Sequence, residues 1–386
     1  MKPTIVFVSL VGLGVAAGVV APAPAGAHPA HHRSPLSFAV IGDAPYGTSP
    51  SDTTQLELLP AFVDAINADA DLHYVVDAGD IHSGKQYCTE AYDQAIFDLW
   101  QQFAVPLIYT PGDNEWTDCH KPAEGGGTYD ATTGQVAYVL DADGDPVDYA
   151  GGDPIANLDL IRRTFFARPG VALGGGRMFV ASQAWFFDWR HPDDADFVEN
   201  VIWTERDVVF VTVNVPGGSN NDQDVWYGAP TESAAQADER AARTGADRRW
   251  LDTAFTLARL TRARAVVITM QADMWDPEKG AAHQAGYEPI IQTLAADALA
   301  FGGPVLMFNG DSHDFLSDNP LAADAPLAYM HPGYDVPNFH RVVVHGSTLP
   351  FEYLRVTIDP RGAAGADDED FGPFRWQRVV PTLDAP

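Results

Sequence analysis

Residues Leu72–Asp80 read LHYVVDAGD, and the fold class can be inferred from this stretch. Its first half is a short apolar run that is typical of a buried β-strand. The run ends in two acidic residues, Asp77 and Asp80, with a glycine between them. Polar residues directly after a buried strand are typical of the carboxyl edge of an α/β sheet, because open sheets of this class bind ligands there.

The same arrangement precedes and follows this stretch. The apolar run Ser37–Ile41 ends in Gly42 and Asp43, and the run Pro106–Thr110 continues into Pro111–Glu115, which reads PGDNE. Two segments between these runs carry apolar residues at helical spacing, namely Thr54–Ala70 and Thr89–Phe103. This order of strand, helix, strand, helix and strand predicts an α/β domain.

The rest of the chain continues the pattern less regularly. Further strands are predicted over Val208–Val213, Ala265–Thr269, Val305–Phe308, Arg341–His345, Tyr353–Ile358 and Phe374–Val380. Further helices are predicted over Leu158–Phe166, Ser233–Leu260 and Tyr287–Leu299. The dipeptide Asp143-Gly144 predicts a hairpin over Val136–Tyr149. The run Val305–Phe308 leads into Asn309–His313, which is a fourth strand end with an acidic residue.

Four strand ends therefore carry oxygen-bearing side chains, including Asp43, Asp80, Asp113 and Asp311. Neighbouring parallel strands lie about 4.8 Å apart, so these side chains are expected to converge on one or two cations. A single Gly-Asp pair is a common turn, and the simplest structural interpretation is a set of turns and helix caps. Four such sites in this order favour a metal site.

The order of these motifs resembles that of the calcineurin-like metallophosphoesterases, which are relatives of the purple acid phosphatases. The family pattern is D-x-H, then GD, then GNH[DE], then a histidine after a later strand, then GHxH. The resemblance spans Phe38 to His313, and the best-matched residues are Asp43, Gly79, Asp80, Gly112, Glu115, Gly310 and His313. It implies a four-layer αββα sandwich, in which two mixed β-sheets are flanked by helices, as a single domain over residues 36–386.

The resemblance also implies a two-metal centre. By this comparison Asp43 and His313 bind one metal, and Asp80 bridges both. The first family histidine is replaced by Pro45, and either Tyr46 or His82 is the candidate to take its place. This chain would therefore be a divergent member of the family.

Three further positions depart from the family pattern. A gap-free match places Asp113 at the metal-binding Asn and Asn114 at the catalytic His, whereas another register makes Asn114 the ligand. Gln271 stands where a histidine is expected after Ala265–Thr269, and Asp311 replaces the first histidine of the last motif. Oxygen ligands favour hard cations, so we expect two divalent cations of the Mn, Mg or Ca type in preference to Zn or Fe.

The candidate residues fall into three groups. The expected metal ligands are Asp43, Asp80, Asp113, Asn114, Gln271, Asp311 and His313. The candidates for catalysis are Asn114, Asp80 and His82. The candidates for substrate binding are Tyr46, Asn220 and Asn221. The last two follow a predicted strand, and a simple turn is the equal alternative for them.

These candidates predict a metal-dependent phosphoesterase that hydrolyses a small phosphorylated substrate with a metal-activated water at a dinuclear, oxygen-rich site. The alternative is a non-catalytic, metal-stabilised binding protein on the same fold. Loss of the family's catalytic histidine favours the alternative, because Asn114 cannot donate a proton as an acid does. An unrelated acidic surface protein would have no specific divalent site.

The first residues predict export. Residues 1–27 combine Lys2, an apolar run and the small-residue end Ala25-Gly26-Ala27, which is typical of a cleaved signal peptide. An uncleaved anchor is the alternative, but the run is short for a bilayer and we expect no stable membrane insertion. Residues 28–35 are expected to be a flexible leader, and the protein to be secreted.

The net charge and the cysteine content are compatible with a secreted protein. The formal net charge is −30, which disfavours binding to nucleic acid. The chain has two cysteines, Cys88 and Cys119. Two cysteines in an exported protein are expected to form a disulfide with each other. The bridge would join the segments that follow the second and third predicted strands.

Overall fold

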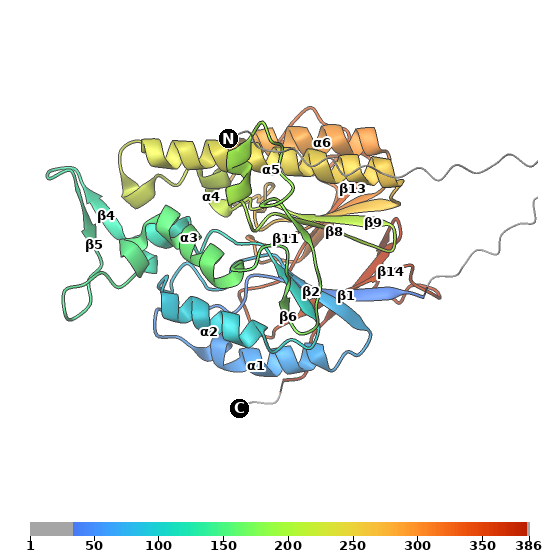
Figure 1. The fold of residues 1–386 in the computed structure, drawn as a ribbon, viewed down its shortest axis with the longest axis horizontal. Coiled ribbons are helices and arrows are strands. Elements are labelled where there is room, and N and C mark those ends of the chain that lie inside the picture. Colours follow the sequence, from blue (N-terminus) through green and yellow to red (C-terminus); the bar gives the residue numbers. More distant parts are fainter. Residues whose placement is uncertain (1–33, 384–386) are drawn as a thin grey trace, which may run out of the picture. The chain divides into compact units, whose positions relative to one another are not determined.

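The computed structural model describes residues 34–383. The expected signal peptide and nearly all of the expected leader lie outside the described residues. Two seven-stranded β-sheets pack face to face, and helices cover the outer face of each (Figure 1). The predicted α/β class, with two mixed sheets flanked by helices, is confirmed.

The first sheet is built around three parallel strands. Its order is β15 (Glu369–Phe371), β16 (Phe374–Val379), β14 (Tyr353–Ile358), β1 (Leu36–Ile41), β2 (Leu72–Asp77), β3 (Pro106–Tyr109) and β6 (Leu173–Gly174). Strands β1, β2 and β3 run parallel, whereas β14 is antiparallel to β1. Its outer face packs on α1 (Thr54–Asn67), α2 (Glu90–Trp100) and α3 (Pro154–Phe165), whose buried side chains include Phe62, Ile96 and Ile161.

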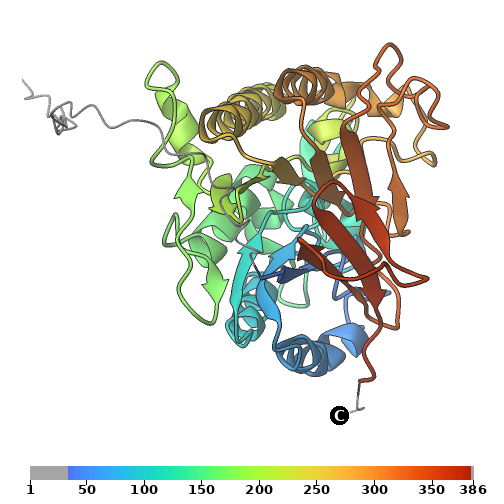
Figure 2. The ribbon, with the colours of Figure 1, turned by 90° about the vertical axis from the view of Figure 1, so that its right-hand side faces the viewer.

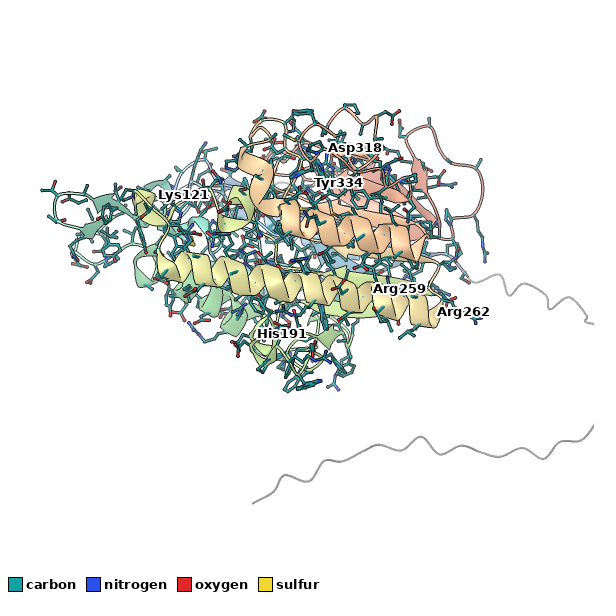
Figure 3. The ribbon with its side chains drawn as sticks, turned by 90° about the horizontal axis from the view of Figure 1, so that it is seen from above. Lys121, His191, Arg259, Arg262, Asp318 and Tyr334 are labelled. Atoms are coloured by element: carbon teal, nitrogen blue, oxygen red, sulfur yellow. A yellow bond between two sulfur atoms is a disulfide. The ribbon has the colours of Figure 1, made fainter. Side chains whose placement is uncertain are left out.

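The second sheet has the same plan. Its order is β12 (Leu316–Asp318), β13 (Phe339–Val343), β11 (Val305–Asn309), β10 (Ala265–Thr269), β9 (Val208–Thr212), β8 (Val201–Glu205) and β7 (Ala181–Ser182). Strands β9, β10, β11 and β13 are parallel. Two long helices, α5 (Ala234–Thr261) and α6 (Glu288–Phe301), lie side by side on its outer face (Figure 3). The C-terminal strands, red in Figure 2, extend both sheets.

Aromatic side chains fill the space between the sheets. Phe38 of β1 is fully buried and packs its ring against Tyr74 of β2 and Phe210 of β9, with ring centroids 4.9 and 5.7 Å apart. Each strand alternates between this layer and the layer below the helices, because successive side chains of a strand point to opposite faces. The central strands are therefore apolar on both faces and form a rigid support for the loops at their carboxyl ends.

The middle of the chain differs from the expectation. The predicted hairpin over Val136–Tyr149 is wrong in its bounds, because the paired strands are β4 (Gly127–Asp130) and β5 (Gln135–Tyr138). The turn at Asp143-Gly144 closes only a single bridge, between Leu140 and Pro146. None of the helices in the described part of the chain is long and apolar enough to cross a membrane.

Candidate metal centre

Loops that follow three parallel strands of the first sheet and one strand of the second sheet meet at one edge of the two sheets. Asp43 follows β1, Asp80 follows β2, Asp113 follows β3, and Asp311 follows β11. The backbone N–H of Asp311 donates to Oδ1 of Asp43 at 2.9 Å, which joins the two sheets at this edge. The structure thus brings together the carboxylates that the sequence predicted at the ends of four strands.

Three of the predicted ligands form a compact group. Ligand atoms of Asp43, Asp80 and His313 all lie within 4.8 Å of one another. Nε2 of His313 is 3.8 Å from Oδ1 of Asp43. The other carboxylate oxygen of Asp43, Oδ2, is buried and has no hydrogen-bond partner among the described residues. Two carboxylates and an imidazole with an unsatisfied oxygen fit a divalent cation.

The negative charges of the carboxylates at this edge are not offset by an equal number of positive groups. Burial raises the pKa of Asp43, Asp80, Asp113 and Asp311 well above the ordinary value, and their neighbouring acidic groups raise it further. Burying a carboxylate without a compensating charge is costly, so the group gains a proton or a cation instead. The ammonium of Lys121 opposes the effect at Asp113.

The Asp311–His313 loop has an unusual backbone. Asp311 and His313 have φ angles of 73° and 67°, which lie in the left-handed region that non-glycine residues seldom adopt. Gly310 between them and β11 is needed for close approach, because a Cβ there would lie 2.4 Å from Oδ2 of Asp43. This loop is therefore shaped by its contact with the first sheet.

Tyr46 occupies the centre of the group. Its hydroxyl donates to Oδ2 of Asp80 at 2.7 Å, accepts from Nδ2 of Asn114 at 2.9 Å, and lies 3.2 Å from Nε2 of His313. Tyr46 was one of two alternatives for the missing first histidine. The structure places its phenol, and not the imidazole of His82, among the candidate ligands.

His82 lies behind the group and is fully buried. Its Nδ1 is 3.1 Å from the carbonyl oxygen of Ser83, and its Nε2 has no partner among the described residues. Burial lowers its pKa to about 4, so the ring is neutral at neutral pH. Only its backbone reaches the site, where its carbonyl oxygen accepts from Nδ2 of Asn114 at 2.9 Å.

Asn114 and Gln271 turn their amide nitrogens toward the carboxylates. Nδ2 of Asn114 donates to Oδ2 of Asp80 at 3.1 Å, and Nε2 of Gln271 donates to the same oxygen at 3.3 Å. The backbone N–H of Gly217 donates to Oε1 of Gln271 at 2.7 Å. Because that N–H must face an acceptor, it sets the orientation of the Gln271 amide.

Asn220 and Asn221 lie outside the group. They belong to α4 (Gly217–Asn221), in which Gly218, Ser219, Asn220 and Asn221 all have φ near +60°, so this turn is left-handed. The amide of Asn220 donates to Thr244 at 2.9 Å, and that of Asn221 donates to Glu239 at 2.9 Å. Both side chains are buried and hold the turn against α5, so we leave them out of the proposed site.

Two bracing interactions were not predicted. Oε1 of Glu115 accepts from the hydroxyl of Tyr109 and from the backbone of Gly112, both at 2.6 Å, and so fixes the loop after β3. In the second sheet, Arg341 pairs with Asp273, whose Oδ2 accepts from the hydroxyl of Ser312 at 2.8 Å. No local pattern marks the second brace, because Arg341 lies on β13, far along the chain.

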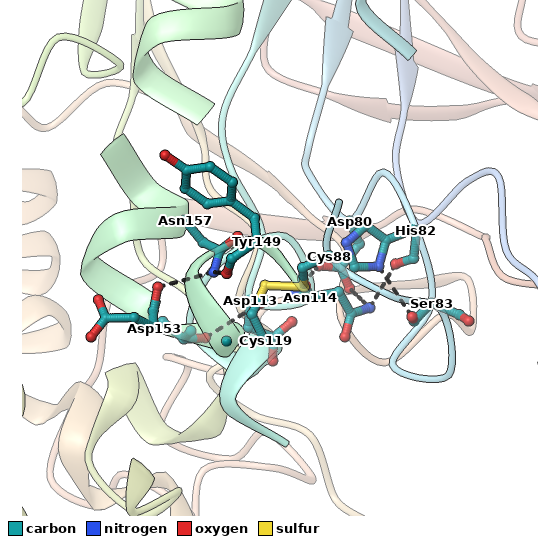
Figure 4. The surroundings of a disulfide bond; sticks show 12 residues. Asp80, His82, Ser83, Cys88, Asp113, Asn114, Cys119, Tyr149, Asp153 and Asn157 are labelled. Carbon is teal, nitrogen blue, oxygen red and sulfur yellow. Dashed lines mark hydrogen bonds between the residues drawn. A yellow bond between two sulfur atoms is a disulfide. The ribbon is translucent and has the colours of Figure 1, made fainter. Parts of the chain in front are cut away.

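The Cys88–Cys119 disulfide is present, with the two Cα atoms 5.8 Å apart. It joins the loop that carries Asp80 and His82 to the loop that carries Asp113 and Asn114 (Figure 4). The bridge therefore ties together two loops of the candidate metal centre, as the sequence predicted.

A cavity of ≈ 570 Å³ opens beside the metal centre. Tyr46 and His313 of the metal centre form part of its wall. The rest of its wall comes from three loops and consists of Gly47, Thr48, Asp52, Thr54, Gln55, Ser83, Gly84, Lys85, Ser347, Thr348 and Leu349. Its size is in the range of small-molecule sites.

Comparisons with known proteins give few matches. The sequence matches no protein-family model and no curated protein. A purple acid phosphatase from yellow lupin (Lupinus luteus) seeds aligns with 84% of this chain and 49% of its own, at 13% identity and a TM-score of 0.40. A Staphylococcus aureus protein assigned as a 5′-nucleotidase, in complex with α-ketoglutarate, aligns with 91% of this chain and 55% of its own, at 12% identity and a TM-score of 0.42. The chain thus spans about half the length of each of these two proteins.

Proposed function

We propose that this protein is a secreted, metal-dependent phosphoesterase that hydrolyses small phosphate esters. The observation that carries the proposal is the group formed by Asp43, Asp80 and His313, of which His313 also lines a cavity. The unpartnered Oδ2 of Asp43 and the raised pKa values of the carboxylates support a site built for cations. The acidic surface otherwise offers little attraction for a phosphate.

We infer that the site holds two hard divalent cations. We assign the first to Asp43, Asp80 and His313, and the second to Asp80, Asp113 and Asp311. The second assignment is supported by Gly217, where a Cβ would lie 2.1 Å from Asp113 Oδ2 and 3.1 Å from Asp311 Oδ1, so both oxygens face the same point. When bound, such cations lower the pKa of a water and offset the charge of the phosphate.

The side chains around the cations have distinct tasks in this proposal. Tyr46 orients Asp80 through its hydroxyl and also lines the cavity. His313 faces the cavity with its pKa lowered to about 4 by burial, so it is a neutral ligand. Asn114 cannot protonate a leaving group, and His82 is turned away. We therefore expect esters with good leaving groups to be the better substrates.

A second candidate function is a non-catalytic, metal-stabilised binding protein. It is favoured by the three protein donors on Oδ2 of Asp80, which come from Tyr46, Asn114 and Gln271. These donors satisfy one carboxylate oxygen without a second cation. A protein of this kind binds a cation and a ligand but does not turn over phosphate esters.

The test is hydrolysis of activated phosphomonoesters and phosphodiesters by protein that has been stripped with chelator and resupplied separately with Mn²⁺, Mg²⁺, Ca²⁺ or Zn²⁺. Asp80→Asn is the test variant, and Asp64→Asn, an exposed position on α1, is the matched control. Turnover that is restored by a hard cation and lost only in Asp80→Asn supports the enzyme. A folded protein that binds the cation without turnover supports the second candidate.

A further inference from the structure

The chain has few lysines. The sequence has four, of which three lie in the described part of the chain. Lys121 is paired with Asp118 at 2.5 Å and with Asp224 at 2.7 Å, as Arg264 is with Asp359 at 2.6 Å. Lys85, by contrast, lines the cavity.

Lys85 is the only lysine or arginine in the wall of the cavity. Its side chain is exposed, and among the described residues its ammonium forms no ion pair. The one carboxylate in the wall, Asp52, is occupied, because it accepts from the backbone of Thr48 at 2.9 Å and from that of Thr54 at 3.1 Å. Asp52 keeps its negative charge, but its oxygens are engaged by the loop, so the ammonium of Lys85 is the charged group of the wall that remains available to an anionic ligand.

The cavity is held open by two buried glutamines. Oε1 of Gln86 accepts from the backbone of Gly47 at 2.8 Å and from that of Ser83 at 3.1 Å. Gln55 accepts from the backbone of Tyr46 at 2.7 Å and donates to the carbonyl oxygen of Ser347 at 2.8 Å. The three loops of the wall are thus joined to one another, and the position of Lys85 relative to Tyr46 is set before a ligand arrives.

The remaining wall carries hydroxyls, but several are engaged within the protein. The hydroxyl of Thr48 donates to Asp52 and that of Ser83 donates to the carbonyl oxygen of Gly47, both at 2.6 Å. Two aromatic rings also line the cavity, those of Tyr46 and His313, and their planes lie at 83° to one another. They therefore do not form two parallel faces that would enclose a planar base.

We propose that Lys85 binds a second anionic group on the substrate, so that the preferred substrate is a small phosphate ester with an additional negative charge. This inference rests on the proposed function, because the phosphate ester must be placed at the metal centre for its leaving group to reach the cavity. The additional charge comes from a carboxylate or from a second phosphate.

The test compares two esters that differ in this charge, 3-phosphoglycerate and glycerol 3-phosphate, with the cation-loaded protein. The measured quantity is the ratio of their kcat/KM values. Lys85→Met is expected to lower the preference for 3-phosphoglycerate about tenfold, as for the loss of a hydrogen bond between charged groups. Lys85→Arg is expected to keep most of it. Arg262→Met, at the end of α5 (Figure 3), is the matched control that removes an exposed charge without changing the ratio.

The inference is overturned if Lys85→Met leaves the ratio unchanged or lowers kcat/KM equally for both esters. Binding of the two esters to the same variants, measured by calorimetry, decides the matter without turnover. If no ester is hydrolysed, the proposed function fails, but a selective loss of 3-phosphoglycerate binding in Lys85→Met still supports the anionic pocket. Equal binding of both esters by the wild-type protein would contradict the anionic pocket.

Discussion

Nε2 of Gln271 lies 2.9 Å from Oδ1 of Asp113, so an amide nitrogen occupies a place where a carboxylate would otherwise meet a cation or another acid. The two candidate functions differ in what happens at this contact. If the amide takes the place of a second cation, the site binds one cation. If a second cation displaces the amide, the site is dinuclear.

Gln271→Glu tests this contact. The substitution adds a carboxylate beside Asp113 and Asp80, so the cation-free protein should be less stable at neutral pH, and Mn²⁺ should bind about tenfold more tightly because the ligand charge is higher. Calorimetric titration with Mn²⁺ measures both the affinity and the number of cations. Gln271→Leu is the uncharged control. Affinity that is unchanged in Gln271→Glu would place Gln271 outside the metal centre.

Cation removal should be visible in thermal unfolding. At a cation concentration of about one hundred times Kd, the folded state gains about 2.7 kcal/mol, which corresponds to a rise in Tm of about 5 °C. Asp43→Asn should abolish the rise, because it removes a ligand charge. In the cation-free state the same variant should not be less stable than the wild type, since it also removes a buried carboxyl of raised pKa. A rise in Tm that persists in Asp43→Asn would contradict the assignment.

The ion pair between Arg341 and Asp273 should fix the position of the loop that carries Asp311 and His313. Arg341 is fully buried, and its Nε also donates to Asp318 at 2.9 Å. Arg341→Met leaves Asp273 without its partner, so we expect a loss of about 3–5 kcal/mol in the free energy of unfolding. Cation affinity should fall about tenfold or more, because Asp273 holds the loop of Asp311 and His313.

The control for this prediction is Arg259→Met. Arg259 pairs with Asp297 at 3.3 Å on the surface of α5 (Figure 3), where such a pair contributes about 1 kcal/mol or less. Urea unfolding and Mn²⁺ titration of both variants give the comparison. Equal losses of stability, or an Arg341→Met variant with unchanged affinity, would show that the brace does not position the ligands.

Asp148 should make stability depend on pH. It is buried, and neither carboxylate oxygen has a hydrogen-bond partner among the described residues. Burial raises its pKa to about 9, and the nearby Asp93 adds to the effect. In the unfolded chain the group ionises near pH 4, so the wild type loses stability as the pH rises from there toward 9.

Asp148→Asn should therefore be more stable than the wild type by at least about 1 kcal/mol at pH 8, and the difference should vanish near pH 4. Urea unfolding at several pH values measures this. The exposed Asp64→Asn should show no such trend. A difference between Asp148→Asn and the wild type that is constant with pH would contradict a protonated Asp148 in the folded protein.

The strand-end residues could be predicted because their positions follow from local patterns. A short apolar run fixes the strand, and parallel strands of one sheet present their carboxyl ends at the same edge. Asp43 and Asp80 therefore came together as expected. The same argument was applied to Asp311, but β11 belongs to the second sheet, so the approach of Asp311 to Asp43 depends on the packing of the two sheets and not on strand spacing within one sheet.

The orientation of the amides could not be predicted. It depends on the N–H of Gly217, which is presented by a left-handed turn after β9 that the sequence indicated only as a Gly- and Asn-rich segment. Likewise, the choice between Tyr46 and His82 depended on the path of two loops, which glutamines at positions 55 and 86 fix through backbone contacts. Such long-range hydrogen bonds leave no periodic signal.

The placement of the lysines has a practical consequence for handling this protein. Amine-reactive labels and amine-coupled surfaces would modify the described part of the chain mainly at Lys85 and Lys279, both of them exposed beside the metal centre. A preparation immobilised in this way would hold the cavity against the support. Attachment through carboxyl groups or through an engineered cysteine away from the Cys88–Cys119 bridge would leave the entrance accessible.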